Sequence, residues 1–253
     1  MSVLRSFDPI IFFQYSFIII SNQLPFFKVK KILVIHNSYK NTGGEDIAVE
    51  NEILFLKKYF EVETLFFSNI ERKSFNLIKS LIFSNNKKSN KLLSEKIKDF
   101  QPDIAYVHNT WFVASLGIFN ILKNKKIKTY VKLHNFRYFC TRSFFSINHY
   151  EGKQMCEACG GRNNKFRILN KYYDDSFFKS IAISLYGSKF FRLLKNHEMK
   201  ILVLTQFHKN FLKDLGISEE KIYVYPNFIN IPIDNENRNE SYIVYAGRIS
   251  EEK

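Results

Sequence analysis

The sequence predicts an α/β protein in which helices flank a Rossmann-like parallel sheet. From Lys31 onward, short apolar runs bounded by polar residues alternate with segments whose apolar residues recur at helical spacing. Strands that alternate with helices of about 10–15 residues are typical of right-handed βαβ units, which build parallel sheets. The 253 residues are 45% apolar and 25% charged, which is the composition of a globular protein with one to two domains.

Short apolar runs predict the strands of this sheet. The first, Lys31–His36 (KILVIH), has an apolar centre bounded by polar residues, as expected of a buried strand. Similar runs recur along the chain. In order, the predicted strands are Lys31–His36, Glu61–Phe67, Asp103–His108, Ile127–Leu133, Lys200–Thr205 and Lys221–Tyr225.

Helical periodicity predicts the elements between the strands. In Glu45–Phe60, for example, Val49, Ile53, Leu56 and Phe60 recur every three or four residues, so they fall on one face of a helix. The stretch Asn135–Lys171 is rich in Gly, Asn, Cys and aromatic residues and predicts irregular structure. The other predicted helices are Ser74–Phe83, Ser89–Phe100, Phe112–Lys123, Ser176–Asn196 and Gln206–Leu215.

The chain divides into four predicted parts. Residues 1–30 form an apolar and basic leader, in which Pro9–Ile20 is too short to span a membrane and lacks the features of a signal peptide. The leader is therefore either a membrane-dipping segment or an over-extended translation start. Residues 31–225 form the Rossmann-like domain, and the polar residues 226–240 form an interdomain linker. Residues 241–253 form the first strand of a second domain, so the sequence looks truncated.

Charge and cysteine content narrow the class of protein. The formal net charge is +14, which predicts an anionic partner such as a membrane surface, phosphates or nucleic acid. Only nine of the 38 basic residues are Arg, and nucleic-acid readers rely on Arg, so the Lys excess favours a diffuse field. Three Cys cannot form a disulfide scaffold. Because no export signal is evident, we expect a cytoplasmic protein with reduced thiols.

A pair of glycines follows the first predicted strand. In open parallel sheets, ligands bind beyond the carboxyl ends of the strands. There, Gly43 and Gly44 would let backbone N–H groups approach a phosphate at the positive end of the next helix. Alternatively they form a tight turn capped by Glu45 and Asp46, whose charges stabilise that helix end and repel a close phosphate.

Two histidines end central strands. His108, followed by Asn109, ends the third strand, and His134, followed by Asn135 and Arg137, comes directly after the fourth. Either histidine alone is more typical of a structural core residue than of a site. Together at one sheet edge, they could hydrogen-bond sugar hydroxyls or a phosphate, or act in acid–base chemistry.

The three cysteines allow a metal site, although they do not demand one. Cys140, Cys156 and Cys159 contain one C-x-x-C pair, and with His134 they would satisfy tetrahedral zinc. Buried reduced thiols are the simpler interpretation, so no metal is predicted. A thioredoxin-like redox pair is disfavoured, because this C-x-x-C lies outside any βαβ pattern.

Several segments, in order, resemble the retaining glycosyltransferases of family 4, which have the GT-B fold. They are the Gly-Gly-Glu-Asp turn, "VHNTW", "LHNFRYFC" with "EGKQMCEACGG", "LTQFHKNFLKDLGISEEKIYVYPNFIN" and "YAGRISEEK". The resemblance runs from Lys31 to Lys253 with matching spacing. It implies the amino-terminal half of a GT-B fold, an acceptor-binding domain followed by the start of a donor-binding domain.

The resemblance also implies an activity and a set of site residues. The enzyme would transfer a sugar from a nucleotide-diphospho-sugar to a glycan or lipid-linked acceptor in surface polysaccharide synthesis, with the donor as substrate and no cofactor or metal. His134 would face the transferred sugar. The donor phosphates would meet Gly43, Gly44, Arg248 and Lys253, and the acceptor would lie near His108, Asn109, Asn135 and Arg137. The protein would sit peripherally on the anionic inner face of the cell membrane.

Two departures from the family pattern bear on these expectations. The family's Glu-x7-Glu motif and nucleotide-base pocket would lie beyond residue 253, so the 253 residues alone are expected to lack activity. Relatives with this Cys-rich loop often carry a fourth Cys before a Tyr, where this chain has Tyr172.

Two other functions are compatible with parts of the sequence. A basic membrane- or nucleic-acid-binding module without catalysis would explain the charge, but the basic residues are scattered and form no recognition helix, and nucleic acid is not expected as a partner. A dinucleotide-binding oxidoreductase requires G-x-G-x-x-G after the first strand, and the sequence there is "NSYKNTGGED". It is excluded.

Overall fold

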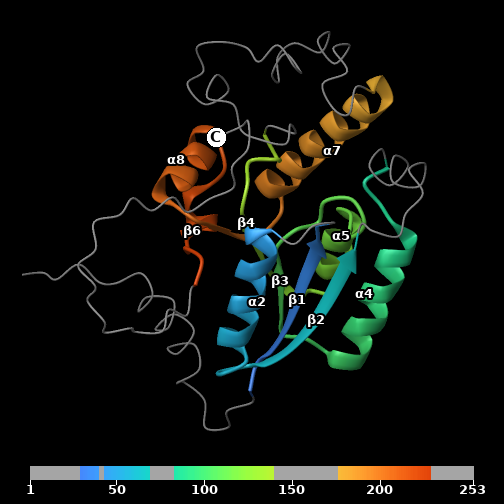
Figure 1. Ribbon diagram of the computed structural model, residues 1–253, viewed down its shortest axis with the longest axis vertical. Coiled ribbons are helices and arrows are strands. Elements are labelled where there is room, and N and C mark those ends of the chain that lie inside the picture. Colours follow the sequence, from blue (N-terminus) through green and yellow to red (C-terminus); the bar gives the residue numbers. More distant parts are fainter. Residues whose placement is uncertain (1–28, 40–42, 69–82, 140–175, 229–253) are drawn as a thin grey trace, which may run out of the picture.

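The computed structural model describes residues 29–39, 43–68, 83–139 and 176–228 (Figure 1). Within them the strands form one six-stranded sheet in the order β2-β1-β3-β4-β5-β6, and every neighbouring pair is parallel. The predicted α/β class with a parallel, Rossmann-like sheet is confirmed. The strands are β1 (Lys31–Ser38), β2 (Glu61–Ser68), β3 (Ile104–Val107), β4 (Lys128–Leu133), β5 (Lys200–Val203) and β6 (Ile222–Val224).

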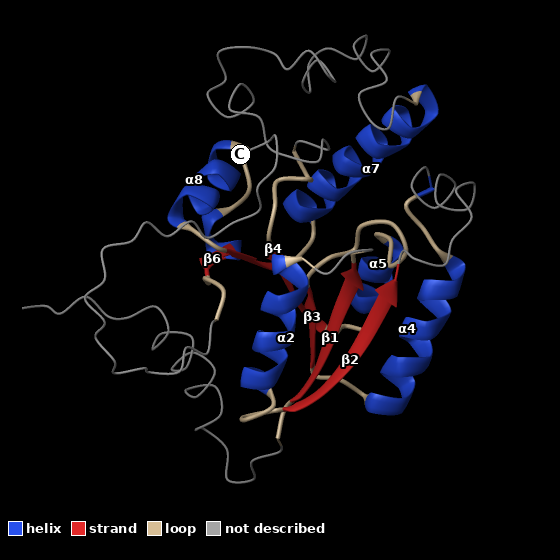
Figure 2. Cartoon of the chain, in the orientation of Figure 1, coloured by secondary structure: helices blue, strands red, loops and turns tan. Residues whose placement is uncertain are grey.

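Helices cover the two faces of the sheet unequally (Figure 2). The larger apolar cluster joins one face to α4, α5, α7 and α8, while the smaller cluster joins the other face to α2. Gly216 ends the last long helix in a left-handed conformation (φ +81°) that favours glycine. The helices are α2 (Gly44–Leu56), α4 (Lys87–Phe100), α5 (Gly117–Asn124), α7 (Phe177–Asn196) and α8 (Gln206–Asp214), with a 3-10 turn, η2 (Glu219–Lys221).

Side-chain caps fix where several helices begin. Asn86, Ser176 and Thr205 precede α4, α7 and α8, and each side-chain oxygen accepts a hydrogen bond from a backbone N–H of the first turn. Thr205 was predicted as the end of a strand, but it caps α8 instead, and β5 ends at Val203.

The predicted helix Phe112–Lys123 is wrong in its first half, because α5 begins only at Gly117. Phe112 (φ 79°) and Ser115 (φ 67°) adopt left-handed conformations that no helix contains. The backbone N–H groups of Val113 and Ala114 donate instead to the side-chain oxygen of Asn37, at 3.1 and 3.0 Å. A tertiary contact therefore replaces the helical hydrogen bonds.

The predicted helix Glu45–Phe60 also extends too far. Helix α2 ends at Leu56, and the N–H groups of Lys58 and Tyr59 donate to carbonyls only three residues earlier. This tight turn brings the chain directly into β2 at Glu61. The other confirmed elements begin and end within a few residues of the predictions.

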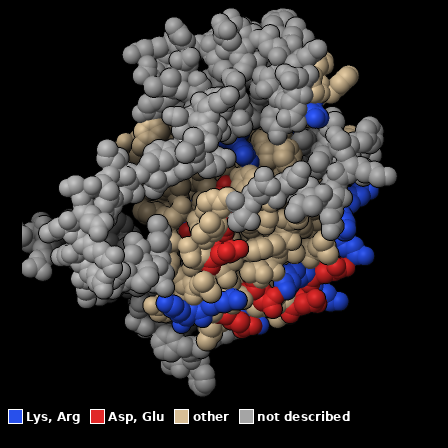
Figure 3. All heavy atoms as spheres, viewed as in Figure 1, with Lys and Arg blue, Asp and Glu red and all other residues tan. Residues whose placement is uncertain are grey.

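Several predictions fall outside the described residues. They are almost all of the helix Ser74–Phe83, most of the irregular stretch Asn135–Lys171, the leader at residues 1–30 apart from its last two residues, most of the linker at 226–240, and the strand at 241–253. No helix in the part of the chain that the structure describes has the length and apolarity needed to cross a membrane. On the face shown in Figure 3, basic and acidic side chains are interspersed along the lower edge.

The strand order determines where a ligand can bind. The chain goes from β1 outward to β2 and then returns to β3 on the other side of β1, which makes β1/β3 the topological switch point. In open parallel sheets, ligands bind in the crevice beyond the carboxyl ends of the strands at such a point. The loops after β1 and β3 carry Gly43–Gly44 and His108–Asn109, so the predicted site residues from these loops lie there.

Candidate functional site

A hollow that opens to solvent lies at the carboxyl ends of β3 and β4. Five of the predicted site residues, from the loops after these strands, line it, and the beginning of α2 contributes a carboxylate. The lining residues are Glu45, His108, Asn109, Thr110, Trp111, Lys132, Leu133, His134, Asn135, Arg137 and Phe190.

The two predicted histidines contact each other directly. His108 Nδ1 lies 3.0 Å from His134 Nε2, and the rings stack with centroids 5.3 Å apart. Desolvation lowers the pKa of His108 well below its usual range, and desolvation with the nearby Lys132 charge lowers that of His134 to about 3. Both imidazoles are therefore neutral at pH 7, and one ring must donate its N–H to the other.

We assign the shared proton to His108 Nδ1. His108 is buried, and its Nε2 has no hydrogen-bond partner among the described residues. If His134 donated, this Nε2 would carry a buried N–H without a partner, which is rarer than an unpaired acceptor. With His108 as donor, His134 Nε2 is the acceptor, so the single N–H of the neutral His134 ring is on Nδ1. This N–H can donate a hydrogen bond to a ligand in the hollow.

The glycine turn is held by Asp46. Its carboxylate accepts hydrogen bonds from His36 Nε2 at 2.9 Å and from the Gly43 N–H at 2.8 Å. Desolvation would raise the pKa of Asp46, but the bonds from His36 and from the Gly43 and Tyr39 N–H groups outweigh it and lower that pKa. This arrangement matches the alternative interpretation of the two glycines, a tight turn capped by an acidic side chain. A Cβ added at Gly44 would meet no other atom within 4 Å, so the space beside Gly44 is open.

Arg137 lines the same hollow and is held in place by Tyr39 and Trp111. Its Nη1 donates to the Tyr39 hydroxyl at 3.1 Å, and its Cζ lies 5.2 Å from the ring centroids of both Tyr39 and Trp111. The Tyr39 hydroxyl in turn donates to Glu45 at 2.8 Å. Desolvation raises the pKa of both Glu45 and Tyr39. Two aromatic rings thus hold a guanidinium at the carboxyl ends of the strands.

The two predicted asparagines of the acceptor side have structural partners. The Asn109 side chain donates to the Asn37 carbonyl at 2.8 Å and accepts from the Trp111 N–H at 2.9 Å. Asn135 accepts from the Arg137 N–H at 3.1 Å and donates to Glu45 at 3.4 Å. Both shape the loops that carry the histidines and Arg137.

A buried ion pair lies beneath the hollow. Lys132 contacts Glu52 of α2, and both side chains are at most 1% exposed. The Tyr106 hydroxyl donates to the other Glu52 oxygen at 2.6 Å. Desolvation lowers the pKa of Lys132 and raises that of Glu52, and the attraction between them opposes both changes. The pair thereby joins α2 to β4 across β1 and β3.

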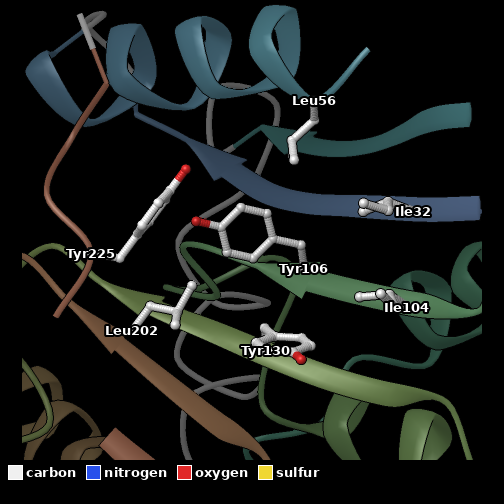
Figure 4. Close-up of a pocket in the computed structure, with 7 residues that line it drawn as sticks. All are labelled: Ile32, Leu56, Ile104, Tyr106, Tyr130, Leu202 and Tyr225. Atoms are coloured by element: carbon white, nitrogen blue, oxygen red, sulfur yellow. The ribbon is translucent and has the colours of Figure 1, made fainter. Parts of the chain in front are cut away.

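A second hollow lies next to this ion pair on the α2 face of the sheet (Figure 4). It is largely apolar, and the hydroxyls of Tyr106 and Tyr225 point toward each other at one end. Its lining residues are Ile32, Leu56, Ile104, Tyr106, Tyr130, Leu202 and Tyr225.

The remaining predicted site residues lie outside the described part of the chain. They are Arg248 and Lys253 on the donor side and the cysteines of the weighed zinc site, Cys140, Cys156 and Cys159. Among the described residues, no group of three or more His, Cys, Asp or Glu side chains is arranged to hold a metal ion.

Sequence reasoning missed Lys132 and Tyr39, and it treated Glu45 only as a helix cap. A signal for Lys132 exists in the sequence, since it interrupts the apolar strand Lys128–Leu133. Glu52 likewise falls on the apolar face of α2 with Val49 and Ile53. A basic and an acidic residue at predicted core positions indicate a buried pair.

No protein-family model matches the chain, and no curated protein matches it. Among solved structures it is similar to a UDP-N-acetylglucosamine 2-epimerase, with 14% identity and a TM-score of 0.40. The match covers 79% of this chain, which spans about half (49%) of that structure. At this level the likeness carries no argument about activity. The fold rests on the sheet itself, and the resemblance to family 4 stays a prediction from the sequence.

Proposed function

We propose that the chain is the acceptor-binding half of a glycosyltransferase. The enzyme would move a sugar from a nucleotide-diphospho-sugar to a glycan or lipid-linked acceptor in surface polysaccharide synthesis, at the cytoplasmic face of an anionic membrane. The sequence motifs support the reaction class. The observation that carries the proposal is the neutral His108–His134 pair in a hollow beyond the carboxyl ends of β3 and β4.

The low pKa of His134 assigns it a role. A group with a pKa of about 3 is a poor base at pH 7, so His134 is not suited to removing a proton. A neutral imidazole with its proton on Nδ1 instead donates a hydrogen bond to a sugar oxygen. His108, which donates to Nε2, fixes this tautomer and is a positioning residue.

The reaction itself needs a second set of groups. The bond from the sugar's anomeric carbon to the diphosphate oxygen breaks, a bond from that carbon to the acceptor oxygen forms, and the proton of the acceptor hydroxyl passes to the departing diphosphate. Arg248 and Lys253 are proposed to neutralise the departing diphosphate. Gly44, with open space beside it, is the glycine that best suits a phosphate approach, because the Gly43 N–H already donates to Asp46.

Nucleotide-sugar turnover tests the proposal. The full-length protein, with membranes of its source cells as acceptor, is given UDP-, GDP- and dTDP-sugars, and release of nucleoside diphosphate is measured. We expect turnover of one donor, and a loss of at least tenfold in His134→Ala, the effect of removing one hydrogen bond to substrate. His197→Ala is the matched control, since His197 comes just before β5 and therefore lies at the amino ends of the strands, away from the hollow. Absence of turnover with every donor, or equal rates for the two variants, contradicts the proposal.

A further inference from the structure

The guanidinium of Arg137 keeps most of its hydrogen-bonding capacity. An arginine side chain has five N–H donors. One of them is used on the Tyr39 hydroxyl, and among the described residues no carboxylate oxygen lies within 4.0 Å of the others. The guanidinium is linked to Glu45 only indirectly, through the Tyr39 hydroxyl. The group is held by its flanking rings, and no carboxylate in the described part of the chain neutralises it directly.

The other basic side chains that line the hollow offer no available positive charge to an anion. Lys132 is neutralised by Glu52, and both histidines are neutral. His134 adds a donor on Nδ1 to the same cavity. Among the described residues that line the hollow, Glu45 is the remaining ionisable group, and burial raises its pKa.

A guanidinium is a rigid, planar group that can bind a carboxylate or a phosphate through two hydrogen bonds at once. We propose that Arg137 binds an oxyanion of the acceptor, so that the acceptor is a glycan carrying a carboxylate or a phosphate rather than a neutral one. This inference rests on the proposed function, because it assigns the acceptor's class within the same site.

Direct binding tests the inference without any transfer reaction. Affinities of the 253-residue chain for glucose, glucuronate and glucose 1-phosphate are measured by titration calorimetry, with inorganic phosphate and UDP as further ligands. At least one charged sugar should bind ten or more times more tightly than glucose, and which one identifies the carboxylate or the phosphate as the source. In Arg137→Gln this difference should vanish, whereas it should persist in Arg192→Gln, which alters an exposed arginine of α7.

Other outcomes overturn the inference. Equal affinities for glucose and both charged sugars, or a preference that survives Arg137→Gln, show that Arg137 only clamps its loop. Inorganic phosphate that binds as tightly as glucose 1-phosphate indicates a site for a free anion, and Arg137-dependent binding of UDP alone indicates the donor diphosphate. None of these results bears on nucleotide-sugar turnover, so the proposed function can stand or fall separately.

Discussion

Lys132 and Glu52 form a buried pair in which each charge needs the other. Lys132→Met should lower the free energy of unfolding by about 3–5 kcal/mol, because Glu52 would stay buried with only the Tyr106 hydroxyl as partner. The double variant Lys132→Met/Glu52→Leu should recover most of that loss. Urea unfolding at pH 7 measures both.

A solvent-exposed pair gives the control for this prediction. Lys91 and Glu95 lie 3.8 Å apart on α4 with side chains 78% and 55% exposed, so Lys91→Met should change stability by less than about 1 kcal/mol. If Lys132→Met costs no more than Lys91→Met, the buried pair does not stabilise the fold.

The histidine pair predicts a loss of stability in acid. The folded-state pKa of His134, about 3, lies below the unfolded value of about 6.5, so the unfolded state binds the proton first. Stability is therefore full above pH 6.5 and falls as the pH drops toward 3. One such histidine lowers the free energy of unfolding by roughly 2 kcal/mol between pH 7 and 5. In His134→Gln the loss over that interval should be smaller by this amount, and an unchanged pH profile contradicts the assignment.

Single residues were predictable from sequence only in part. The placement of His108 and His134 at one sheet edge follows from their positions at strand ends. Their hydrogen bond does not follow, because it depends on side-chain rotation. Lys132 and Glu52 lie 80 positions apart, and neither residue's local pattern indicates its partner.

At the scale of elements, Asn37 joins the end of β1 to the turn before α5. Its side-chain oxygen accepts from the buried N–H groups of Val113 and Ala114. Asn37→Ala should lower the free energy of unfolding by roughly 2–5 kcal/mol, since each unpaired buried N–H costs about 1–3 kcal/mol. Thermal or urea unfolding checks this. Asn124→Ala, at the exposed end of α5, should have little effect, and an equal effect of the two changes contradicts the role of Asn37.

The same contact explains where element prediction failed. Phe112, Phe119 and Leu122 fit a helical pattern, but the turn takes its hydrogen bonds from a residue 76 positions away. Local periodicity contains no information about such a partner. Helices whose caps are local, such as α7 after Ser176, were predicted almost to the residue.

At the scale of the whole molecule, the net charge of +14 predicts binding to anionic membranes without nucleic-acid recognition. The protein should bind vesicles that contain 30% phosphatidylglycerol at low salt, should leave them at high salt, and should ignore phosphatidylcholine. Duplex DNA should bind weakly or not at all. DNA binding with a steep log–log salt dependence would favour the alternative, a basic binding module.

The architecture was the most predictable level. Alternating strands and helices predict parallel pairing, which the sheet confirms. The order β2-β1-β3 was not predictable from periodicity, because which strand returns to the centre depends on how whole helices pack. That order places the switch point between β1 and β3, next to the hollow beyond the carboxyl ends of β3 and β4.

The most direct test of the central claim, that the hollow beyond β3 and β4 binds a sugar, uses the histidine rings as reporters. Ring signals of the 253-residue chain are assigned by NMR and followed while glucose 1-phosphate is added. The account predicts that the signals of His108 and His134 move together and saturate, while that of His197, at the amino ends of the strands, stays in place. Signals of His108 and His134 that do not move, or a larger shift at His197, would contradict it.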